Sequence, residues 1–112
     1  MFGVLGGIGA SPENLSTMKA TADRLLGDSY RFSVLGAGPS QIPLATMGAI
    51  LGGHVRVGLE DSLTIGPGQL AAGTAAQVRK IRRILEELSL EIATPDEARE
   101  MLQLKGPKQV AF

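Results

Sequence analysis

The chain has 112 residues, of which 44% are hydrophobic, and this is enough for one modest core. Its 11 basic and 11 acidic residues give a formal net charge of zero. Nucleic-acid binding needs a basic footprint, so this balance argues against a dedicated nucleic-acid binder. The sequence contains no cysteine, which excludes disulfides and thiolate metal sites and suits a reducing compartment.

The apolar run at residues 1–10 is far too short to span a bilayer, and no basic segment precedes it as in a signal peptide. Pro12 and Glu13 follow it at once. We therefore expect a soluble cytoplasmic protein that does not bind membranes.

Three short segments with strand-like composition recur at about 25-residue spacing. They are Phe2–Leu5, Tyr30–Leu35 and His54–Leu59, and each is followed by a helix signal. Strands joined by helices at this spacing form right-handed parallel βαβ units. The sequence therefore predicts an α/β fold, in which Pro67, between two glycines, marks a loop after the third strand, where such folds build their sites.

The first two helices are predicted from a cap and from apolar residues. Ser11 and Pro12 begin the first helix, as N-cap and first-turn proline, and Gly27 ends it. The second helix runs from about Ser40 to Leu51 and has so little polar surface that we expect it to be deeply buried. The apolar stripe of the first helix consists of Leu15, Met18, Ala22, Leu25 and Leu26.

Two further helices are predicted from capping boxes. Thr74 and Gln77 form such a box at the start of the third helix, and Thr94 and Glu97 open the fourth in the same way. Lys-Gly-Pro at residues 105–107 is expected to end the fourth helix. The apolar stripe of the third consists of Val78, Ile81, Ile84, Leu85 and Leu88.

The third helix also contains a basic run, residues 79–83. Glu86 and Glu87 follow Arg82 and Arg83 at a spacing of four residues, which allows ion pairs along the helix. We therefore interpret this run as a solvated helix face.

The third strand carries an unusual set of charges. His54, Arg56 and Glu60 share one face by alternation, and Asp61 follows at the end of the strand. We expect an interior strand, in which such charges must be paired or must bind something. An active-site strand and a half-exposed strand with an Arg56 salt bridge are both consistent with this pattern. In an extended strand Arg56 lies about 13 Å below Glu60, so its long side chain would need to reach up toward the end of the strand.

One motif suggests a dinucleotide fold. Gly36 and Gly38 lie between a strand and a helix, and the acidic Glu60 and Asp61 end the next strand. This approximates the fingerprint in which helix amides hold a pyrophosphate and an acid binds a ribose hydroxyl. The third glycine position is Gln41, which would hinder the close approach of helix and strand. A plain turn between strand and helix is the alternative.

A second set of motifs covers nearly the whole chain: Gly6-Gly7, Ser11–Leu15, Gly52–Asp61, Gly68–Ala71 and Glu91–Arg99. This set resembles the β-keto acid cleavage enzymes, a family that includes 3-keto-5-aminohexanoate cleavage protein. The family usually has an asparagine where this chain has Ser62, and a Ser-Asn pair where it has Gly73-Thr74.

The resemblance implies a zinc-dependent (β/α)₈ barrel that cleaves a β-keto acid with acetyl-CoA as co-substrate. The products are acetoacetate and a new CoA thioester. In that family two histidines from an early strand and one glutamate from the last strand hold the zinc, and Glu60 matches the glutamate. Arg56 and Asp61 match a catalytic pair that assists proton transfer.

The chain lacks the two-histidine motif, since His54 is its single histidine. His54 is expected some 20 Å from Glu60 along the strand, as a packed or hydrogen-bonded structural residue. A complete barrel needs about 250 residues. We therefore expect residues 1–112 to be one partial barrel segment, the C-terminal three βα units plus a short helix from about residue 95. Such a segment is expected to be inactive alone, and to form a homo-oligomer or to associate with an N-terminal barrel portion. A nucleotide-binding module and a non-catalytic assembly segment remain as alternatives.

Overall fold

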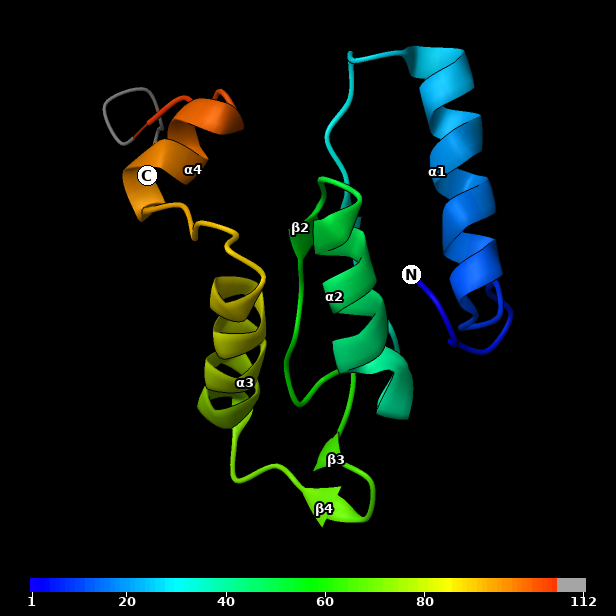
Figure 1. Ribbon diagram of the computed structural model, residues 1–112, viewed down its shortest axis with the longest axis vertical. Helices are drawn as coiled ribbons and strands as arrows, with labels where there is room; N and C mark the ends of the chain where they lie inside the picture. The colour runs from blue at the N-terminus through cyan, green and yellow to red at the C-terminus, as the bar shows by residue number, and fades with distance from the viewer. Residues whose placement is uncertain (107–112) are drawn as a thin grey trace.

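A small parallel sheet joins three segments that are far apart in the sequence; the computed structural model describes residues 1–106 (Figure 1). Strand β1 (Ser33–Val34) pairs in parallel with β2 (His54–Val55). On the other side of β1, Phe2 forms a parallel bridge to Gly36, and its N–H donates to Leu35 O at 2.9 Å. The three segments therefore lie side by side in chain order, as parallel βαβ units require.

The strands are shorter than the sequence predicts. The first is a bridge at Phe2 and not a strand over residues 2–5, because the chain turns at Gly3 and Gly6, which both have positive φ. The third ends at Val55, so the expectation of an extended segment through Leu59 is wrong. β2 also lies at an edge of the sheet within the described residues, and not in its interior as expected.

The helices occur where the sequence predicts them. A short 3₁₀ helix, η1 (Gly38–Ser40), precedes the second of them. The α-helices are α1 (Pro12–Leu26), α2 (Gln41–Ile50), α3 (Thr74–Glu87) and α4 (Pro95–Met101).

Two of the predicted helix caps are confirmed. The Asn14 N–H donates to Ser11 Oγ at 3.3 Å, and Thr94 and Glu97 form a complete capping box. The predicted box at Thr74 is wrong, since the N-cap of α3 is Gly73 and makes no side-chain cap. Helix α4 ends at Met101, before Lys105 and Gly106; Pro107 lies outside the described residues.

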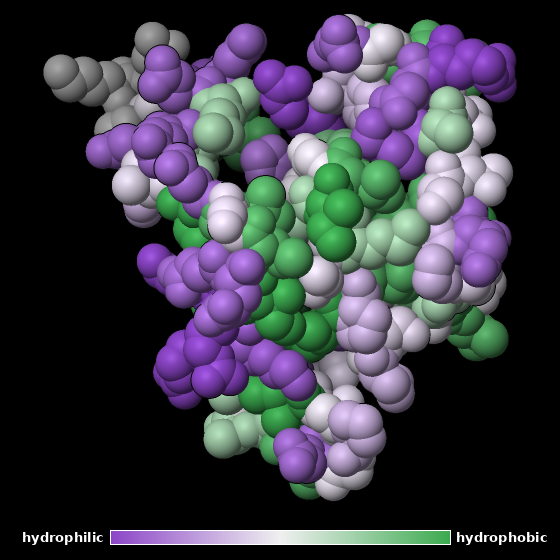
Figure 2. All heavy atoms as spheres, viewed as in Figure 1, coloured by the Kyte–Doolittle hydropathy of each residue, from purple (hydrophilic) through white to green (hydrophobic). Residues whose placement is uncertain are grey.

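Helix α2 connects two buried clusters. Leu44 packs with Phe2, Leu15 and Val34 on the side of α1 and the sheet, while Ala45 packs with residues of α3. The expectation that α2 is deeply buried holds for these positions but not at its end, where Ile50 is 63% exposed. Figure 2 shows hydrophobic side chains gathered over α2, beside the hydrophilic surface of α3.

Along the chain, a small hairpin follows β2 and precedes α3. The sequence predicts only a loop at this place. Strands β3 (Thr64–Gly66) and β4 (Gln69–Leu70) pair antiparallel across Pro67 and Gly68. Gly68 has a φ of 67°, a backbone conformation that favours glycine.

Within residues 1–106, no helix is long and apolar enough to cross a membrane.

Candidate active site

Arg56 brings the two candidate carboxylates together immediately after β2. Its Nη2 donates to Glu60 Oε2 at 2.6 Å, and its Nε donates to Asp61 Oδ2 at 3.0 Å. The long side chain of Arg56 thus reaches both acids, although an extended strand would place Arg56 about 13 Å from Glu60. The chain leaves the strand at Val55 and turns, and the Asp61 N–H donates to Gly58 O at 3.2 Å.

The two carboxylates differ sharply in exposure. The side chain of Asp61 is 8% exposed, whereas that of Glu60 is 82% exposed and Arg56 is half exposed. Asp61 is thus a nearly buried anion fixed by a planar guanidinium, an arrangement that orients a carboxylate well. The carboxylate of Glu60 is thus accessible from solvent.

Two buried glutamines hold the loop that carries these acids. Gln41, from the start of α2, donates its Nε2 to Gly58 O at 2.8 Å. Gln77, from α3, donates its Nε2 to Ser62 O at 2.6 Å and also reaches Thr64 O. Both glutamines are at most 1% exposed. The loop is therefore fixed on both sides of Glu60 and Asp61 by amides from two helices.

Sequence reasoning missed the role of both glutamines. It treated Gln41 as an obstacle to a pyrophosphate and Gln77 as half of a capping box. The available signal was the position of each amide on a helix face with buried apolar residues, such as Leu44 beside Gln41 and Ile81 beside Gln77. A polar residue at such a position must find a hydrogen-bond partner.

Two further contacts complete the support of the loop. The Gly38 N–H donates to Asp61 O at 2.7 Å, and Thr74 Oγ1 accepts from the Leu59 N–H at 3.3 Å. A Cβ on Gly36 would lie 2.6 Å from Ser40 O, so glycine is required for the turn into η1. In the supposed dinucleotide motif, Gly36 thus allows a tight turn, and Gly38 contacts the loop of residues 58–62, here called the acidic loop.

The described part of the chain does not make a zinc site by itself. No group of three or more histidine, cysteine or acidic residues within residues 1–106 is arranged to hold a metal ion. A structural zinc needs four ligands and a catalytic one three from the protein, and Glu60 supplies one at most. His54 lies exposed on β2 and is not packed as expected.

The family model for β-keto acid cleavage enzymes matches residues 1–104. The chain is 63% identical over its full length to a 3,5-dioxohexanoate:acetyl-CoA acetone transferase of Paraburkholderia graminis, of which it covers 36%. It is 39% identical over 102 residues to a 3-keto-5-aminohexanoate cleavage enzyme of Acetoanaerobium sticklandii, which is 91% of this chain and 36% of that enzyme. The chain thus spans about a third of the length of these relatives, and it belongs to the β-keto acid cleavage enzyme family.

Proposed function

We propose that this chain forms the C-terminal βα units of a (β/α)₈ barrel that cleaves a β-keto acid with acetyl-CoA. The acyl group of the β-keto acid is transferred to CoA, and the remaining two-carbon unit joins the acetyl group to give acetoacetate. The observation that carries the proposal is the 63% identity, over the whole chain, to a relative named as an acetyl-CoA acetone transferase. The parallel order of Phe2, β1 and β2 is consistent with consecutive barrel strands.

In this proposal Asp61 transfers a proton at the carbon between the two carbonyl groups of the β-keto acid. Its low exposure and its bond to Arg56 Nε support the assignment, since a general base needs a fixed position. Arg56 orients Asp61 and compensates its charge. Glu60, the exposed carboxylate, is proposed as one zinc ligand, with the other ligands supplied by residues outside this chain. When bound, zinc would polarise the keto oxygen of the substrate.

The proposal is tested by measuring acetoacetate formation from acetyl-CoA and a β-keto acid such as 3,5-dioxohexanoate. The enzyme is the assembled barrel, meaning this chain together with the preceding barrel part. We expect Asp61→Asn to lower kcat by about 10²–10⁴-fold, the usual worth of a positioned base. Asp28→Asn, an exposed aspartate, is the matched control and should leave kcat unchanged. Equal rates for the Asp61→Asn variant and the wild type would contradict the assigned role.

A further inference from the structure

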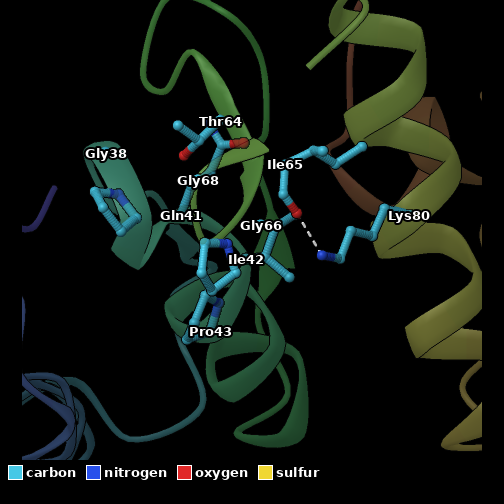
Figure 3. Close-up of a pocket in the computed structure, with 11 residues that line it drawn as sticks. Gly38, Gln41, Ile42, Pro43, Thr64, Ile65, Gly66, Gly68 and Lys80 are labelled. Carbon is cyan, nitrogen blue, oxygen red and sulfur yellow. Dashed lines mark hydrogen bonds between the residues drawn. The ribbon is translucent and has the colours of Figure 1, made fainter. Parts of the chain in front are cut away.

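A hollow of about 440 Å³ lies between the start of α2, the β3–β4 hairpin and α3 (Figure 3). Its wall consists mainly of proline, glycine and isoleucine residues, and Lys80 is its single charged residue. Small-molecule sites of about 300–1,000 Å³ with a mostly apolar lining and few polar groups are typical of proteins. The hollow also adjoins the acidic loop, because Gly38, which lines it, donates its N–H to Asp61 O at 2.7 Å.

Lys80 is a cation without an acidic partner in this wall. Its half-buried side chain extends from α3, and its Nζ donates to Ile65 O. None of the ion pairs formed within residues 1–106 includes Lys80. An ammonium group has three donors, so two remain for a ligand. A partly buried cation of this kind favours an anion at the same place.

Two arginines extend this positive charge beyond the hollow. Arg79 and Arg83 line a neighbouring hollow of about 320 Å³, which shares Lys80 and Ile65 with the first. The solvated face expected for the basic run is found at Arg82, which pairs with Glu86 at 2.7 Å. Arg79 and Arg83, like Lys80, take part in none of the ion pairs of the described chain.

We propose that these hollows bind the CoA part of acetyl-CoA; this inference rests on the proposed function. The phosphates of CoA would lie against Lys80, Arg79 and Arg83, and the pantetheine arm would follow the apolar wall. Figure 3 shows Lys80 on one side of the hollow and Gly38 on the other. An arm that starts at Lys80 and runs to Gly38 carries the thioester toward the loop that contains Asp61, where the chemistry is proposed to occur.

The position of the hollow within the proposed barrel supports this assignment. The active sites of (β/α)₈ barrels are built from the loops that follow the strands. Here Gly38 and Pro39 follow β1, and Thr64 and Gly66 belong to the connection after β2; all four line the hollow. The dinucleotide motif suggested that Gly36 and Gly38 bind phosphate. In the structure the positive charges that could bind phosphate lie on α3 instead.

Calorimetric titration of the 112-residue chain with CoA tests the proposal without depending on catalysis. We expect one CoA per chain and tighter binding of CoA than of pantetheine. Lys80→Met keeps the length of the side chain and removes its charge, so it should weaken CoA about tenfold or more and leave pantetheine unchanged. Arg24→Met, which removes an exposed charge from α1, is the matched control.

A second variant tests the course of the arm. A Cβ on Gly66 would lie 3.8 Å from Lys80 Nζ, so the larger side chain of Gly66→Val narrows the hollow, whereas the charge of Lys80 is retained. It should weaken both CoA and pantetheine. The proposal is overturned if CoA does not saturate the chain, if Lys80→Met and Arg24→Met weaken it equally, or if a folded Gly66→Val chain binds it normally. This measurement of CoA binding involves no catalytic step, so a failure of the catalytic assignment would leave its result intact.

Discussion

At the scale of single residues, the acidic loop shows how a turn changes the meaning of a sequence pattern. Alternation correctly singled out Arg56, Glu60 and Asp61 as a set of charges that needs pairing. It assumed an extended strand, along which the long side chain of Arg56 would need to reach toward Glu60, about 13 Å away. Turn hydrogen bonds to Gly58 O end that extension, and no local propensity in the valine-rich segment indicates them.

Gln77 is predicted to stabilise the fold through its hydrogen bond to the acidic loop. Gln77→Met keeps the volume of the side chain but leaves the buried Ser62 O without its donor. An unsatisfied buried acceptor costs about 1–3 kcal/mol, so the free energy of unfolding in urea should fall by that amount. Gln103→Met, at an exposed glutamine, should have no effect. Equal stability of the two variants would mean that the amide does not hold the loop.

At the scale of elements, two similar sequence patterns had different outcomes. Thr94 and Glu97 form their capping box because α4 is exposed and no other partner competes for them. Thr74 and Gln77 have the same spacing, but tertiary partners take both side chains, at Leu59 and Ser62. The sequence therefore predicted the existence of α3 but not its cap, since those partners are distant in sequence.

The capping box of α4 should make this helix sensitive to acid. The Thr94 N–H and hydroxyl donate to Glu97 and lower the pKa of its carboxyl below the ordinary 4.5. The contribution of the box to the stability of α4 is therefore complete above about pH 4.5 and is lost as the pH falls through the folded-state pKa. NMR chemical shifts of residues 95–101 should show loss of helix in acid. Glu97→Gln should remove this pH dependence, and an unchanged titration in that variant would contradict the role of Glu97.

The β3–β4 hairpin is the element that the sequence analysis missed. Its strands have three and two residues, too few for a periodic pattern to indicate them. Pro67 and Gly68 gave a turn signal, which was assigned to an irregular loop. Two contacts that form only in the folded chain keep this segment ordered. They are the pairing of β3 with β4 and the hydrogen bond from Lys80 Nζ to Ile65 O.

At the scale of the whole molecule, the chain exposes more surface than a closed domain of its size. Its accessible surface is 7938 Å², whereas a folded monomer of 11.7 kDa is expected to expose about 5,900 Å². The radius of gyration is 15.3 Å, compared with about 13 Å for a compact chain of this length. The predicted α/β class is confirmed, and the open shape favours a segment that packs against further protein.

We therefore predict that the isolated chain self-associates. Leu25 and Leu26 of α1 are 65% and 51% exposed, and β2 is unpaired on its outer side within the described residues. Sedimentation velocity should show an average mass that rises with concentration. Leu25→Glu combined with Leu26→Glu should reduce this rise, whereas Thr21→Glu, which adds charge to the same helix, should not. A monomer at all concentrations would favour a closed small domain.

The most direct test of the central assignment is the zinc content of the assembled barrel, measured together with its turnover, in the Glu60→Gln variant. A neutral amide is a poor zinc ligand, so this variant should lose zinc and activity together. The Asp61→Asn variant, measured beside it, should keep its zinc and lose turnover alone. Full zinc content and near-normal turnover in Glu60→Gln would contradict the account and leave Arg56, Glu60 and Asp61 as a structural ion-pair cluster.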